Sequence, residues 1–124
     1  MKVLSLLGRV AFALIFIAAG VMHFTEERFF VRIMPPYLPY HRLLVHFSGV
    51  AEILLGTLLL IPATSRAAAW GLIALLIAVF PANIHVYQNQ DLVPAAPMIH
   101  TIRLFLQVVL ILWAYWYTRP PREI

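Results

Sequence analysis

The sequence predicts an all-α membrane protein in which four transmembrane helices form a bundle, and three observations predict this class. Of the 124 residues, 63% are hydrophobic and 11% are charged, whereas a soluble globular chain is about half apolar and about a quarter charged. The mean hydropathy is +0.89. Four apolar segments also approach the length of about 20 residues that a helix needs to cross a bilayer.

The four predicted spans follow one another within one domain, residues 1–124, because a chain of this length has room for no second one. Pro62 follows the second span and Pro97 precedes the fourth, and proline ends or begins a helix more readily than it continues one. The spans cover about residues 4–24, 43–61, 67–87 and 98–117.

The first span also has features of a secretory signal peptide, since Lys2 precedes an apolar run. Arg9 interrupts that run, however, and no small-x-small cleavage site follows it. We therefore expect the first span to be retained.

The segment between the first two spans, TEERFFVRIMPPYLPYHR (residues 25–42), is too polar to cross the membrane and unusually aromatic. Thr25 is expected to cap a short helix there, with Phe29 and Phe30 on one face. The prolines that follow favour an extended path. We expect an interfacial lid segment between helices 1 and 2, and an amphipathic connector without a gating role is the alternative.

The polar side chains of the spans gather on one side of the membrane. Successive spans run in opposite directions, so the ends of spans one and three share a side with the starts of spans two and four. Every histidine of the chain falls there, on the side away from the termini. The candidate pocket residues are His23, His46, Glu52, Asn83, His85, His100 and Arg103.

Glu52 is the deepest of these residues, about 13 Å along its helix at 1.5 Å per residue. An ionised acid in hydrocarbon costs several kcal/mol unless a partner compensates it, so Glu52 is expected to face the interior. Arg103 is the expected partner because its side chain is long and enters from the same side. His23 and His100 are the next candidates, and a protonated Glu52 hydrogen-bonded to an imidazole is a further alternative.

Gly49 and Gly56 share the helical stripe of Glu52 at 100° per residue. Small residues beside a polar one let a neighbouring helix approach closely. The same stripe therefore fits two interpretations, a functional pocket or a polar contact that joins two helices.

The remaining composition excludes whole classes of function. The net charge of +4 does not indicate nucleic-acid binding, because the basic residues lie at the ends of apolar runs. The absence of cysteine excludes a thiol relay, a disulfide framework and a thiolate metal site. No HExxH motif and no histidine pair at i, i+4 is present, so no metal site is predicted. A haem site has equally little support.

An amphipathic ligand such as a quinone fits the histidine, arginine and asparagine donors better than a metal or a haem does.

The predicted orientation of the chain across the membrane rests on a small difference in the number of basic residues on its two sides. The predicted terminal side carries five basic residues and the opposite side four, a lean toward cytoplasmic termini. The first group is Lys2, Arg9, Arg66, Arg119 and Arg122, and the second is Arg28, Arg32, Arg42 and Arg103. We expect a multi-pass protein of the bacterial inner membrane.

Short motifs along nearly the whole chain resemble those of the DoxX-like family of small membrane proteins. They are GVMHF at 20–24, PPYLP at 35–39, GVAEILLG at 49–56 and FPANIHV at 80–86. The resemblance implies a four-helix integral membrane bundle, linked in this family to quinone-dependent oxidoreductase systems and, in the wider group, to assembly factors. It carries over His23, Glu52 and Asn83 as residues of interest. The absence of cysteine excludes the thiol–disulfide chemistry of some similar four-helix enzymes.

These observations lead to one expected function and two alternatives. The first is an accessory subunit of a quinone-linked membrane oxidoreductase, and the others are a non-enzymatic assembly factor and a small-molecule carrier. No catalytic residue can be assigned, because no nucleophile with its base is recognisable and an enzyme in its own right is less favoured. The expected partners are the lipid bilayer, other membrane subunits or a second copy of the chain.

Overall fold

The computed structural model describes residues 2–119, and within them it contains helices and no strand. Four helices are long and apolar enough to cross a membrane, as the sequence predicts. They are α1 (Lys2–Thr25), α3 (His41–Leu59), α4 (Ser65–Gln88) and α5 (Pro97–Trp116). The short helix α2 (Glu27–Arg32) joins α1 to α3, and the 3-10 turn η1 (Gln90–Leu92) lies between α4 and α5. Arg122, predicted on the terminal side, lies outside the described residues.

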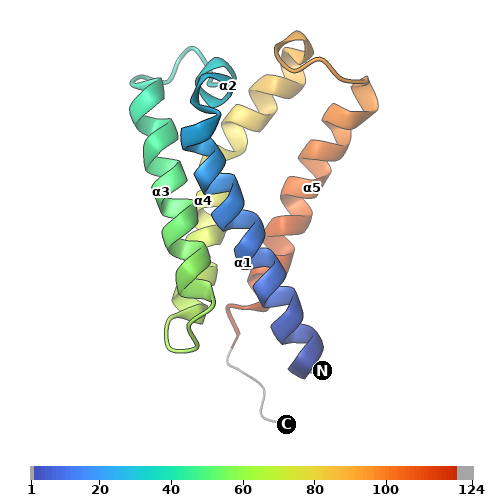
Figure 1. The fold of residues 1–124 in the computed structure, drawn as a ribbon. Coiled ribbons are helices and arrows are strands. Elements are labelled where there is room, and N and C mark those ends of the chain that lie inside the picture. Colours follow the sequence, from blue (N-terminus) through green and yellow to red (C-terminus); the bar gives the residue numbers. More distant parts are fainter. Residues whose placement is uncertain (1, 120–124) are drawn as a thin grey trace.

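The helices alternate in direction, so the start of α1 and the end of α5 lie at one end of the molecule (Figure 1). Helix α2 and the η1 turn lie at the opposite end. This arrangement brings the last turns of α1 and α4 and the first turns of α3 and α5 to the end that carries α2. We call this the α2 end, and the other the terminal end.

Helix boundaries follow local sequence signals, with two corrections. Helix α3 ends at Leu59, two residues before the predicted boundary, where the Thr64 hydroxyl donates to the Leu58 carbonyl at 2.7 Å. Thr25 does not cap the short helix: α1 continues through Thr25, and Glu26 occupies the N-cap position without a side-chain cap bond. Pro81 lies inside α4, which continues to Gln88.

Helices α1 and α3 pack with their backbones close together. A Cβ atom placed on Gly49 would lie 2.8 Å from the His23 Cβ and 3.0 Å from the Gly20 carbonyl oxygen. One placed on Gly20 would lie 2.6 Å from the Gly49 carbonyl oxygen. The close approach predicted from the glycine stripe is therefore present, and it is made with α1. Further along the chain, α3 packs on α4 and α4 on α5.

The apolar core lies toward the terminal end. It includes the stacked rings of Phe12 and Phe16, whose centroids are 4.8 Å apart, together with Leu59 and Leu72. Most of the remaining helix surface faces outward, since only 17–22% of each span is buried within the chain. Exposed leucine, isoleucine, valine and phenylalanine on all four long helices suit a lipid environment, where such surface costs nothing to expose.

Candidate functional site

The buried pair at the α2 end of α1 and α3 is His23 and Glu52. Their side chains are 11% and 12% exposed, and His23 Nδ1 lies 3.1 Å from Glu52 Oε2. The glycines described above allow this contact, because a side chain at position 49 would occupy the space beside His23. An imidazole and a carboxyl therefore meet inside the membrane-spanning part of the chain.

The hydrogen bonds of this pair are incomplete. His23 Nδ1 donates to the Ala19 carbonyl at 2.7 Å, which assigns the ring proton to Nδ1. The Nδ1 proton points to the carbonyl and not to Glu52. Glu52 Oε2 is buried, and it receives no hydrogen bond from the described residues. A buried acceptor without a partner costs about 1–3 kcal/mol, and more when it is charged. Glu52 is thus suited to hold a proton or to bond a ligand.

Helix α2 supplies an aromatic cover for His23. The Phe30 ring stacks on the imidazole with centroids 3.9 Å apart and planes 17° from parallel. Phe29 meets Phe30 edge-to-face at 5.2 Å, and the Arg32 guanidinium lies 5.6 Å from the Phe29 ring centre. Phe30 therefore faces the His23–Glu52 pair, and Phe29 packs against Phe30.

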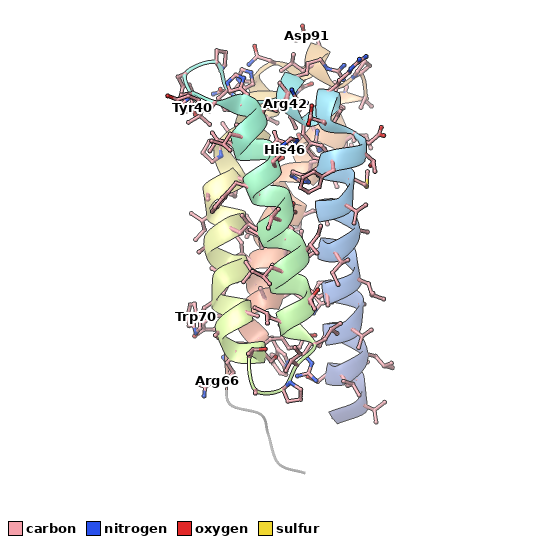
Figure 2. The ribbon with its side chains drawn as sticks, turned by 60° about the vertical axis from the view of Figure 1, so that its left-hand side comes forward. Tyr40, Arg42, His46, Arg66, Trp70 and Asp91 are labelled. Atoms are coloured by element: carbon pink, nitrogen blue, oxygen red, sulfur yellow. The ribbon has the colours of Figure 1, made fainter. Side chains whose placement is uncertain are left out.

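A second histidine–carboxylate pair lies nearer the membrane surface and fastens α2 to α3. His46 Nε2 donates to Glu27 Oε2, and Arg42 Nε lies 3.1 Å from Glu27 Oε1. His46 also stacks on Phe24, with ring centroids 5.0 Å apart. Arg42 and His46 lie near the α2 end, with Arg66 and Trp70 near the other (Figure 2). We call Glu27, Arg42 and His46 the α2 latch.

The latch should depend on pH through Glu27. The hydrogen bond from His46, followed by the positive charge of Arg42, lowers the pKa of Glu27 below its usual 4.5. Because the pKa of Glu27 is lower in the latched state, its carboxylate stabilises the latch fully above pH 4.5. This stabilisation is lost as the pH falls from 4.5 through the lowered pKa.

We therefore expect α2 to loosen in acid. The chain has no cysteine, so Arg28→Cys can carry a fluorescent label on the exposed side of α2. Label anisotropy should be high at neutral pH and fall as the pH drops below 4.5. The labelled protein that also carries Glu27→Gln should show low anisotropy across this pH range. If its pH profile were identical to that of the labelled protein that keeps Glu27, the latch would be contradicted.

The predicted partner of Glu52 is wrong. Arg103 forms no ion pair within residues 2–119, and His23 is the neighbour of Glu52 instead. The reason is the packing order. Arg103 belongs to α5, which packs on α4, whereas the stripe of Glu52 on α3 faces α1.

Asn83 joins a separate polar contact between α4 and α5. Its Nδ2 donates to Gln107 Oε1 at 2.9 Å, and Gln107 Nε2 donates to the Leu76 carbonyl at 2.8 Å. Gln107 is buried within the span region, so these bonds hold α5 against α4. Among the described residues, no hydrogen bond joins Asn83 to His23 or Glu52.

The other predicted residues are divided between the interior and the surface. His100 is 2% exposed, and neither ring nitrogen has a hydrogen-bond partner among the described residues. His85 lies at the end of α4, where its Nδ1 accepts from Asn89 Nδ2 at 3.2 Å. Of the seven predicted pocket residues, the recorded contacts bring only His23 and Glu52 directly together.

Two residues important to the site were not among the predicted pocket residues. Glu27 bonds His46, and Phe30 covers His23. The pairing of Glu27 with position 46 depends on how the 25–42 segment folds back, which no periodicity in the sequence specifies. The phenylalanine pair next to two glutamates was the available signal. Within residues 2–119, no group of three or more His, Asp or Glu is arranged to hold a metal ion.

Comparison with protein families gives one match. The family model described as a domain of unknown function, DUF8561, matches residues 12–118. The chain belongs to the DUF8561 family. No curated protein and no solved structure matches the chain. The matched region of this DUF8561 chain includes the His23–Glu52 pair, the α2 latch and the Asn83–Gln107 contact.

Proposed function

We propose that this DUF8561 chain is a DoxX-like accessory subunit of a quinone-linked membrane oxidoreductase, and that the His23–Glu52 pair binds the quinone head group. The observation that carries the proposal is the Glu52 carboxyl, buried in the span region with an oxygen that receives no hydrogen bond from the described residues. Such a group is costly in a membrane and usually marks a ligand, ion or proton site.

The chemistry of the pair suits a quinone. A quinone carbonyl accepts hydrogen bonds, and a protonated Glu52 can donate one. A neutral His23 with its proton on Nδ1 leaves Nε2 as an acceptor, which suits the hydroxyl of the reduced form. The Phe30 ring offers a flat apolar surface beside these groups. The isoprenoid tail would remain in lipid.

We also propose a finer arrangement of the fold. The four spanning helices form one bundle, and residues 25–42 act as a lid at the membrane interface that the α2 latch holds closed. Both termini are cytoplasmic, and the protein resides in a bacterial inner membrane with other subunits or a second copy of itself. The contacts of α2 with both α1 and α3 support the lid, because they tie one segment to both helices of the pair.

Two other functions make different predictions. A non-enzymatic assembly factor would recognise a client through its helix faces, most of which are exposed. A small-molecule carrier would use Glu52 as its proton-coupled group and would work in liposomes without other proteins.

The test is mass spectrometry of the intact complex released from native membranes. We expect a redox subunit and a quinone to accompany the protein. A client protein without quinone would favour the assembly factor, and the chain alone with transport activity in liposomes would favour the carrier.

A further inference from the structure

Two hydrogen bonds at the terminal end connect three parts of the chain that each carry an arginine. Arg9 Nη1 on α1 donates to the Ser65 hydroxyl at 3.3 Å, and Ser65 precedes Arg66 on α4. Arg66 Nε donates to the Thr118 carbonyl at 3.1 Å, and Thr118 precedes Arg119. Arg9, Arg66 and Arg119 therefore belong to segments that these bonds hold together, and we call the three residues the arginine corner.

The arginine corner has no neutralising acid within residues 2–119. Glu26, Glu27 and Asp91 lie at the α2 end, and Glu52 lies within its span. Arg9 and Arg66 donate hydrogen bonds to a hydroxyl and a carbonyl, which are uncharged acceptors. Within residues 2–119, the positive charge at this end therefore has no carboxylate partner.

The donors of the corner also remain largely unused. A guanidinium has five N–H donors, and the Arg9 Nε atom is buried without a partner. Arg66 and Arg119 are exposed. Guanidinium groups with free donors match the oxygens of a phosphate, which they bind through parallel hydrogen bonds.

The aromatic residues around the corner place it at the level of lipid head groups. Trp70, Tyr115 and Trp116 are 53%, 46% and 50% exposed, and tryptophan and tyrosine concentrate at the membrane–water interface. Arg119 lies 5.6 Å from the Tyr115 ring centre and 5.8 Å from that of Trp116. Its charge is thereby held beside the aromatic belt.

We propose that Arg9, Arg66 and Arg119 bind the phosphate of an anionic phospholipid. A zwitterionic lipid carries its own cation beside the phosphate and leaves the charge of the corner uncompensated. Free phosphate has the same oxygens but no acyl chains to lie against the exposed apolar faces of α1, α4 and α5. The anionic lipid satisfies both requirements, and its binding is independent of the His23–Glu52 site.

The test measures lipid binding to the purified full-length chain in detergent by native mass spectrometry. We expect phosphatidylglycerol to bind at least tenfold more tightly than phosphatidylcholine, and inorganic phosphate alone not to be retained. Arg66→Gln and Arg119→Gln remove exposed side chains and should each weaken phosphatidylglycerol binding about fivefold, since one basic residue near a membrane surface contributes about 1 kcal/mol.

Arg28→Gln is the matched control, because it removes one exposed cation at the α2 end. It should leave the affinity unchanged. Arg9→Lys keeps the charge but loses the fork of donors and should also weaken binding. Equal binding of the two lipids, equal losses in Arg28→Gln and Arg66→Gln, or retention of inorganic phosphate as strong as that of the lipid would each overturn the proposal.

Discussion

Replacing Glu52 by glutamine is expected to weaken the binding of a short-chain quinone at least tenfold while leaving the folded protein as stable or more stable. The loss follows because the amide N–H of glutamine is a weaker hydrogen-bond donor to a quinone carbonyl than the O–H of a protonated carboxyl; tenfold corresponds to about 1.4 kcal/mol. The gain in stability follows from removing a buried carboxyl whose Oε2 has no hydrogen-bond partner among the described residues.

The opposite signs of these two effects separate a binding site from a structural contact. If Glu52 only joined α3 to α1 through His23, the glutamine variant would lose stability. Quinone affinity is measured by equilibrium dialysis of protein in nanodiscs, and stability by unfolding in mixed micelles. Glu26→Gln is the control, because it neutralises an exposed carboxyl next to α2 and should change neither quantity.

Gly49→Leu is expected to cause a large loss of stability, because Gly49 lies in the α1–α3 contact. The new side chain would meet the Gly20 carbonyl oxygen at 3.0 Å and the His23 Cβ at 2.8 Å. Backbone and Cβ atoms cannot move aside as a flexible side-chain end can, so the helices must separate. Overpacking of this kind costs about 1–3 kcal/mol.

The separation should also disrupt the site, because His23 and Glu52 meet across this contact. Unfolding in mixed micelles measures the stability, and dialysis measures the quinone affinity. Val50→Leu is the matched control, since Val50 is 54% exposed on the same helix. Equal stability of the two variants would show that α1 and α3 do not pack through these glycines.

The sequence predicts the helices well because crossing a bilayer makes simple demands. A run of about 20 apolar residues and a proline at its boundary can be recognised locally in the sequence. The position of the histidines at one end of the molecule can also be predicted, because it depends only on the alternating direction of the helices. The close approach at Gly49 could be predicted for the same reason, as the spacing of small residues shows which face they share.

Which helices pack together, and so which residues pair, could not be predicted in the same way. A period of 100° per residue tells which residues share a face, but not which neighbouring helix that face meets. Arg103 and Glu52 enter from the same side on compatible stripes, yet α5 is held to α4 through Gln107, and α3 meets α1. The α2 latch depends on a fold-back of the chain, so Glu27 and His46 meet although 19 positions separate them.

The most direct test of the quinone site is photoaffinity labelling of the intact protein in nanodiscs with an azido-quinone, followed by peptide mass spectrometry. A quinone site at the buried pair predicts that the label attaches around His23, Phe30 and Glu52, and that an excess of unmodified quinone prevents it. Labelling spread evenly over the lipid-facing sides of α1, α3, α4 and α5, and unaffected by unmodified quinone, would contradict a quinone site at the buried pair.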